Sequence, residues 1–261
     1  GKLLFTGEYL VLDGANALAF PTKFGQSMSV TKINEPKIIW KSFNCNDEIW
    51  LHCEFLINEI ELPQNKIGDE KDRLISILRE VKKLNPKFLN ETNGYCIITK
   101  LDFARNWGLG SSSTLISNIS KWTNVDPFQL LDATFGGSGY DIAAAQRNAP
   151  ILYAKALNEY HITELSINWG FTNQIFFVHL NKKQNSRNGI FKYQKLKNNN
   201  QEAIERINEL TTTICHCQSL LQFELVIDEH EQLISKTIQQ KTIKELWFND
   251  YKGSIKSLGA W

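Results

Sequence analysis

The hydrophobic pattern of this 261-residue chain changes from strand-like to helix-like along its first half, which limits the folds open to it. Five short segments rich in β-branched and aromatic residues come first, separated by Gly, Pro and Asn: Lys2–Phe5, Tyr9–Leu12, Ser27–Thr31, Ile38–Lys41 and Glu48–Phe55. From Asp69 to Leu84 the apolar residues then recur at helical spacing. The sequence therefore predicts an α+β chain.

Later segments continue the mixture of strands and helices. The patterns predict strands over Gly94–Phe103, Ile151–Lys155, Gln174–Leu180 and Gly189–Gln194, and helices after Ser111, from Asp126-Pro127, over Ile142–Gln146, over Gln201–Leu221 and over Leu225–Gln239. Composition shifts near Asn168–Asn173. We therefore expect two domains, residues 1–168 and 169–261.

Charge and composition exclude several classes of protein. The 29 basic and 28 acidic residues give a net charge of +1, so we expect no nucleic-acid or membrane partner. No apolar run approaches the roughly 20 residues that span a bilayer, and no signal-peptide pattern opens the chain, which favours a cytoplasmic location. The five cysteines lack a CxxC pair, so we expect reduced thiols, with Cys215-His216-Cys217 in the core and not at a metal.

A glycine- and serine-rich loop, Gly108–Ser113, lies between a predicted strand and a predicted helix. Glycines allow the backbone to approach a ligand closely, and the first N–H groups of a helix favour anions. The loop could therefore hold a polyphosphate while a serine hydroxyl binds Mg²⁺. A serine that only caps the helix explains the same residues. The chain has no Walker A loop.

Two further segments carry candidate chemistry. Gly136–Asp141 is a glycine-rich turn that places one carboxylate near the start of a helix, where it could serve only as a cap. Gly1–Tyr9, here called the first motif, carries Lys2 on a strand and Glu8 just after a glycine. Alone, Lys2 would be an ordinary exposed lysine.

Together, these segments resemble the motifs of the GHMP superfamily, the kinases of galactose, homoserine, mevalonate and phosphomevalonate. The first motif and the following Val11–Gly14 resemble those of mevalonate and phosphomevalonate kinases. Trp107–Ser113 resembles the second, phosphate-binding motif. Gly137–Ala143 is similar to the turn that carries the catalytic aspartate, and is closer to phosphomevalonate kinase and to a bacterial subfamily with a Gly-Tyr-Asp-Ile-Ala signature.

The resemblance implies a role for each matched residue. ATP would be bound by Trp107, Gly108, Leu109, Gly110, Ser111, Ser112 and Ser113, and the acceptor pocket would be bordered by Glu8, Tyr9, Ser138, Gly139 and Tyr140. Asp141 would be the catalytic carboxylate, as base or as orienter of the acceptor hydroxyl, and Lys2 its ion-pair partner. Ser112 would bind Mg²⁺. Asp132 is the candidate acidic Mg²⁺ ligand, although its spacing departs from the family pattern by one residue.

The implied fold has an N-terminal domain like the second domain of ribosomal protein S5 and a ferredoxin-like C-terminal domain. The implied activity is ATP- and Mg²⁺-dependent phosphorylation of a small metabolite. A compound of the mevalonate pathway is the leading candidate for this metabolite. A diphosphomevalonate-decarboxylase-like enzyme and a non-catalytic ATP or metabolite sensor are the alternatives. Lys256–Trp261 resembles the opening of a third glycine-rich motif, so the resemblance predicts a trimmed chain.

Overall fold

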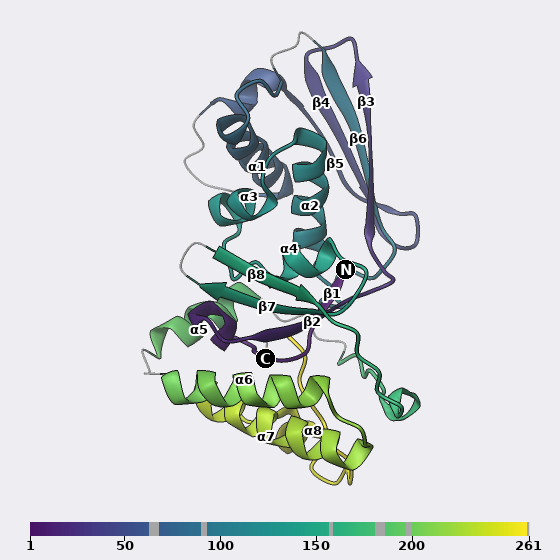
Figure 1. Ribbon diagram of the computed structural model, residues 1–261. Helices are drawn as coiled ribbons and strands as arrows, with labels where there is room; N and C mark the ends of the chain where they lie inside the picture. The colour runs from purple at the N-terminus through teal and green to yellow at the C-terminus, as the bar shows by residue number, and fades with distance from the viewer. Residues whose placement is uncertain (63–67, 90–92, 157–158, 181–185, 197–199, 260) are drawn as a thin grey trace. The chain divides into compact units, whose positions relative to one another are not determined.

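The computed structural model describes residues 1–62, 68–89, 93–156, 159–180, 186–196, 200–259 and 261 (Figure 1). Its internal contacts define two compact units. Unit 1 contains Gly1 and Thr22–Ala145, and unit 2 contains Lys2–Pro21 and Gln146–Trp261. The chain therefore passes between the units after Gly1, after Pro21 and after Ala145.

Unit 1 has a four-stranded sheet in the order β3-β6-β4-β5. Its strands are β3 (Gln26–Ile33), β4 (Lys37–Phe43), β5 (Ile49–Leu56) and β6 (Gly94–Leu101). β4 and β6 run parallel, and the other neighbours are antiparallel. Alternate residues of β4 are buried, as expected of a strand with one face against a core.

Helices of unit 1 pack on this sheet (Figure 1). They are the 3₁₀ helix η2 (Ile57–Ile60), α1 (Glu70–Leu84), α2 (Ser111–Thr123), α3 (Pro127–Thr134) and α4 (Tyr140–Ala145). Asp69 caps α1 by accepting a hydrogen bond from the Asp72 amide, 2.9 Å away, and Asp126 caps α3 in the same manner. The core joins Trp40 of the sheet to Ile77, Ile116 and Ile142 of the helices.

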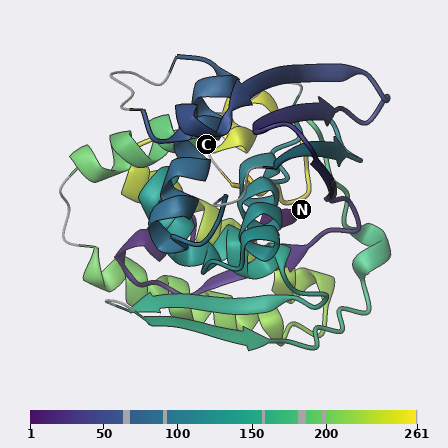
Figure 2. The same ribbon diagram turned by 90° about the horizontal axis from the view of Figure 1, so that it is seen from above.

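Unit 2 has a second four-stranded sheet, in the order β1-β2-β7-β8. It comprises β1 (Lys2–Leu4), β2 (Ala17–Pro21), β7 (Ile151–Ala156) and β8 (Glu159–Glu164), and all of its neighbours are antiparallel. Figure 2 shows β7 and β8 as neighbouring arrows. The first strand of the chain thus joins strands that lie far from it in the sequence.

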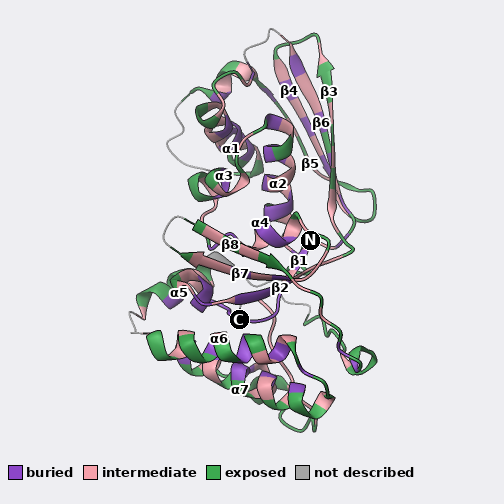
Figure 3. Cartoon of the chain, viewed as in Figure 1, coloured by how far each residue is buried: buried purple, intermediate pink, exposed green. Residues whose placement is uncertain are grey.

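The helices of unit 2 are η1 (Leu10–Asp13), η3 (Thr172–Gln174), α5 (Ser186–Lys195), α6 (Gln201–Cys215), α7 (Leu220–Ile238) and α8 (Ile243–Trp247), of which η1 and η3 are 3₁₀ helices. Along α6 and α7 buried residues alternate with exposed ones, as Figure 3 shows. One core cluster gathers Phe5, Trp169 and Phe223, and another gathers Leu10 and Ile234.

Most predicted elements are confirmed within a few residues, but three predicted strands are wrong. Tyr9–Leu12 is no strand, because Tyr9 and the flanking Gly7 and Gly14 have positive φ, and a 3₁₀ helix begins at Leu10. Gly189–Gln194 belongs to helix α5. The described residues 175–180 form no strand, and Phe176, Phe177 and Val178 are exposed there. Five short elements, β2, β8, α8, η2 and η3, were not predicted.

The α+β class is confirmed, whereas the division into residues 1–168 and 169–261 stays a prediction. The contacts group Lys2–Pro21 and the strands β7 and β8 with the C-terminal helices. Beyond Glu164 the described residues form helices and no strand. The ferredoxin-like arrangement also stays a prediction, which these helices by themselves do not bear out.

Three further observations concern the described residues only. They contain no helix that is both long and apolar enough to cross a membrane. No three of their His, Cys, Asp and Glu side chains are grouped to hold a metal ion. None of the five cysteines, all of which are described, is in a disulfide; Cys217 is buried, whereas Cys215 is partly buried.

Gly94 at the start of β6 offers a test of the first sheet. A Cβ atom there would lie 1.8 Å from the Lys37 carbonyl oxygen, so the Gly94→Ala variant must push two strands apart. We expect its free energy of unfolding to fall by about 2 kcal/mol or more in urea denaturation. Gly25→Ala is the control, because a Cβ atom there meets nothing within 4 Å. Equal stability of both variants would contradict the register of β6.

Candidate functional site

The loop Trp107–Ser113 in unit 1 has a backbone conformation that depends on its glycines. Gly108 and Gly110 have φ of +75° and +86°, which residues with a Cβ atom rarely adopt. Gly110 is the N-cap of α2 and offers no side chain to accept hydrogen bonds from the first turn. The positive end of the helix dipole is therefore left without a side-chain cap.

The three serines of the first turn differ in exposure. Ser113 is buried and its hydroxyl donates to the Gly110 carbonyl oxygen, 2.8 Å away, so it stabilises the loop. Ser111 is half-buried, and Ser112 is exposed. Ser112 is therefore the serine of this turn whose hydroxyl is most accessible to a ligand.

Contacts within unit 1 fix this loop in place. The Thr114 hydroxyl donates to the side-chain oxygen of Gln26 on β3, 2.9 Å away. The Asn118 side-chain amide donates to the Gln26 carbonyl oxygen, 2.8 Å away. Leu109 is buried, whereas the exposed Trp107 ring meets the Phe24 ring edge-on, with 5.6 Å between centroids. A Cβ atom on Gly1 would lie 3.1 Å from the Leu109 carbonyl oxygen, so the start of the first motif lies beside the loop.

The aspartate turn belongs to the same unit. Gly136, Gly137 and Gly139 all have positive φ, and the turn ends in α4 with Asp141 in its first turn. Asp141 is half-buried, and its carboxylate accepts a hydrogen bond from the Ile142 amide, 3.0 Å away. Ser138 and Gly139 are buried and Tyr140 is half-buried, whereas Asp132 is exposed on α3.

Unit 1 brings the helices of these two candidate segments together. Helix α2, which follows the loop Trp107–Ser113, packs against α4, which carries Asp141, and Ile116 and Ile142 share one core cluster. Helix α3 with Asp132 also packs against α2. The rigid packing of three helices therefore sets where the loop, Asp132 and Asp141 lie relative to one another.

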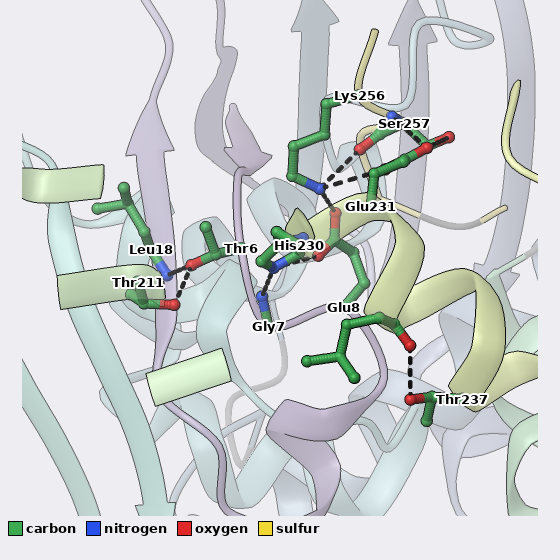
Figure 4. A network of polar contacts seen from close by, with 11 residues as sticks. Thr6, Gly7, Glu8, Leu18, Thr211, His230, Glu231, Thr237, Lys256 and Ser257 are labelled. Carbon is green, nitrogen blue, oxygen red and sulfur yellow. Dashed lines mark hydrogen bonds and ion pairs between the residues drawn. The ribbon is translucent and has the colours of Figure 1, made fainter. Parts of the chain in front are cut away.

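The first motif places Lys2 and Glu8 in unit 2, and both are buried. Lys2 lies on β1 opposite Pro21 of β2. The Glu8 carboxylate is bonded by the ammonium of Lys256, and its other oxygen lies 3.5 Å from His230 Nε2 (Figure 4). His230 Nε2 also accepts a hydrogen bond from the Gly7 amide, 3.2 Å away, so this nitrogen carries no proton.

Burial shifts the pKa of Glu8, Glu231 and His230. Burial raises the pKa of Glu8 to about 7, although the charge and hydrogen bond of Lys256 work against this increase. Burial also raises the pKa of Glu231, which Lys256 likewise opposes. Burial and the charge of Lys256 hold the pKa of His230 well below its usual value, so His230 is neutral at pH 7.

Tyr9 is also held inside unit 2. Its φ of +59° is unusual for a residue with a Cβ atom, and its ring lies against Tyr193 with 5.5 Å between centroids. Its hydroxyl accepts a hydrogen bond from the Trp261 amide, 3.2 Å away. Gly189 lies so close that a Cβ atom there would be 2.4 Å from this hydroxyl.

The sequence-predicted site residues therefore fall into two groups. The loop Trp107–Ser113, Asp132 and Ser138–Asp141 belong to unit 1, whereas Lys2, Glu8 and Tyr9 belong to unit 2. The ion pair between Lys2 and Asp141 stays a prediction, as do the roles of all these residues.

Sequence reasoning missed His230, Glu231 and Lys256. One signal pointed to His230, because it lies three residues after Ile227 and four before Ile234, on the buried face of α7.

Comparison with known proteins supports the fold but no closer relation. No family model and no curated protein matches the sequence. Among solved structures, the Methanococcus jannaschii mevalonate kinase has a TM-score of 0.66 at 14% identity, covering 99% of this chain and 85% of its own. The Lactococcus lactis galactokinase in complex with galactose has a TM-score of 0.68 at 12% identity, covering 100% and 81%.

A third structure, the Streptococcus pneumoniae phosphomevalonate kinase in complex with phosphomevalonate and AMPPNP, has a TM-score of 0.62 at 14% identity, covering 91% and 78%. These proteins are GHMP kinases. The chain therefore has an α+β fold with two sheets that is structurally similar to GHMP kinases, at an identity too low to assign a subfamily or substrate.

The raised pKa of Glu8 predicts a specific pH dependence of stability. Between pH 5 and 7 the folded chain holds a proton on Glu8 that the unfolded chain has released, so rising pH weakens the fold by at most about 1.4 kcal/mol per pH unit. In the Glu8→Gln variant this position no longer titrates. Its free energy of unfolding, measured in urea from pH 5 to 8, should therefore rise relative to wild type up to about pH 7 and then level off. A constant difference would contradict the prediction.

Proposed function

We propose that this protein transfers the γ-phosphoryl group of ATP to a small metabolite. The observation that carries the proposal is the loop Gly108–Ser113, which opens helix α2 without a side-chain cap and keeps Ser112 exposed. Backbone amides and a helix dipole at such a loop stabilise phosphate charge without a basic surface. That suits a chain whose net charge is only +1. The structural likeness to GHMP kinases supports the same activity.

Within this proposal, residues Trp107–Ser113 bind ATP. Gly108 and Gly110 let the backbone approach the phosphates. The buried Ser113 stabilises the loop through its hydrogen bond to the Gly110 carbonyl oxygen. The exposed Trp107 and Phe24 rings flank the loop. The phosphomevalonate kinase among the similar structures is in complex with AMPPNP, an ATP analogue, which supports ATP as a ligand of this fold.

The residues present also fit a magnesium ion. Mg²⁺ in phosphoryl-transfer sites takes one or two protein ligands and completes its shell with phosphate oxygens and water. The exposed Ser112 hydroxyl and the exposed Asp132 carboxylate, on helices that pack together, supply such ligands. When bound, the ion would neutralise charge on the transferred phosphoryl group.

Asp141 acts on the acceptor in this scheme. Its half-buried carboxylate would orient or deprotonate the acceptor hydroxyl, and Lys2 would offset its charge and keep it ionised. Phosphoryl transfer needs positioning and charge stabilisation more than covalent participation, so two such groups are enough. Ser138, Gly139 and Tyr140 would border the acceptor.

We propose a mevalonate-type hydroxy acid or its phosphorylated form as the acceptor. Support comes from the first motif and the Gly-Tyr-Asp-Ile-Ala turn, and from similar structures that include mevalonate kinases and a phosphomevalonate kinase. The two-domain organisation, S5-like followed by ferredoxin-like, belongs to this proposal.

A coupled ADP-release screen with mevalonate, phosphomevalonate, homoserine and sugars tests the acceptor. Release of CO₂ would point to the decarboxylase-like alternative, and ATP binding without turnover to the sensor.

Replacing Asp141 with Asn tests its assignment. The amide keeps the shape of the side chain but cannot accept a proton, so we expect ADP formation to fall at least about 100-fold. Calorimetry should show Mg-ATP affinity within about twofold of wild type. Asp250→Asn, at an exposed aspartate, is the control. Turnover of Asp141→Asn equal to that of the control would remove Asp141 from this role.

Replacing Ser112 with Ala tests the metal site. Loss of one Mg²⁺ ligand should weaken Mg-ATP binding about tenfold, whereas binding of ATP in EDTA should change less. The measurement is calorimetry with and without Mg²⁺. Ser166→Ala, at an exposed serine of unit 2, serves as control. If Mg-ATP and metal-free ATP weaken equally, Ser112 contacts the nucleotide and not the ion.

A further inference from the structure

The C-terminal segment, defined as residues 251–259 and Trp261, is held in unit 2 by side chains. Its described residues form neither helix nor strand. Instead the Lys244 ammonium donates to the Gly253 carbonyl oxygen at 2.7 Å, and the Ser257 amide and hydroxyl donate to Glu231 of α7 at 3.1 and 2.7 Å. Since no regular backbone pairing fixes the segment, these contacts decide its position.

Lys256 makes the central contact of this segment. Its side chain is 4% exposed; its ammonium bonds Glu8 and lies 3.8 Å from the second carboxylate oxygen of Glu231 (Figure 4). Both glutamates are themselves buried, so one cation serves two carboxylates. A buried charge that loses its partner is strongly unfavourable, which makes the three side chains mutually dependent.

The Glu8 side chain is buried and held by its neighbours in unit 2. It is 1% exposed, and one carboxylate oxygen is taken by Lys256. The neighbours of Glu8 are held as well, because the Gly7 amide donates to His230 on α7 and the Tyr9 hydroxyl accepts from the Trp261 amide. The end of the first motif is therefore tied to α7 and to the C-terminal segment at consecutive residues.

We propose that Lys256 is a buried latch that fastens the C-terminal segment to the first motif, and that Glu8 serves this latch as a positioning residue. The latch itself depends only on unit 2. The statement that Glu8 positions Tyr9 for the acceptor, and does not contact the acceptor, rests on the proposed function.

Hydrogen exchange measured by mass spectrometry tests the latch without any activity. In Lys256→Met, which keeps the aliphatic stem, we expect amides of both the C-terminal segment and residues 5–12 to exchange at least about tenfold faster. Lys252→Met, at an exposed lysine of the same segment, should leave both unchanged. Faster exchange in the C-terminal segment alone, or equal effects of both variants, would overturn the proposal.

The double variant separates charge pairing from simple packing. Glu8→Gln/Lys256→Met removes one of the two carboxylates that Lys256→Met leaves without a cation, so exchange should be slower than in Lys256→Met alone. A purely steric role of Lys256 predicts no such rescue and would overturn the latch. If Lys256→Met does not fold, Glu8→Gln decides alone, since it should speed exchange in the C-terminal segment.

Kinetics test the positioning role once the ADP-release screen has supplied an acceptor. Glu8→Gln and Lys256→Met should then raise the acceptor KM by similar factors, with Mg-ATP affinity within about twofold of wild type. A large increase in acceptor KM in Glu8→Gln alone would mean that Glu8 touches the acceptor. Absence of Mg-ATP binding in wild type would reject the proposed function, whereas the exchange results would still decide the latch.

Discussion

The ion pair between Lys256 and Glu8 joins the C-terminal segment to the first motif inside unit 2, and the proposed latch depends on it. Removing a charge from water carries a penalty of several kcal/mol, which only a close partner offsets. Here Lys256 serves two buried carboxylates, and His230 beside them is neutral. The Oε2 atoms of Glu8 and Glu231 and Nδ1 of His230 find no hydrogen-bond partner among the described residues. Lys256 therefore offsets only part of the cost of burying these groups. That explains why the pKa of Glu8 is raised to about 7 in spite of a bonded lysine.

In unit 1 the candidate residues are positioned by backbone conformation, whereas in unit 2 they are positioned by buried charged side chains. Five glycines, Gly108, Gly110, Gly136, Gly137 and Gly139, have positive φ in two turns that each open a helix. Helices α2 and α4 then pack together around apolar residues, which holds the two turns in a constant relation. The candidate polar groups are thus carried on packed helices, as the proposed phosphoryl transfer would require.

The sequence predicted local features well where a local pattern decides the structure. The helix start at Asp126-Pro127 and the amphipathic pattern of α1 were visible, because each depends on residues within one or two turns. The glycine turns were visible for the same reason. The strand predicted at Gly189–Gln194 failed because the contacts of Ile190 and Tyr193 with the core of unit 2, three residues apart, favour a helix there. Residues Phe176–Val178 have strand-like composition but no strand to pair with among the described residues.

The sequence by itself determined the α+β class, the two glycine-rich turns and the identity of the residues that could bind phosphate or accept a proton. Such properties follow from short-range rules of backbone geometry and side-chain chemistry. Only the tertiary structure decided that Ser113 points inward while Ser112 is exposed, and that Glu8 is buried against Lys256, 248 residues away in the chain. Burial and charge pairing depend on contacts between segments remote in sequence, and no local pattern records them.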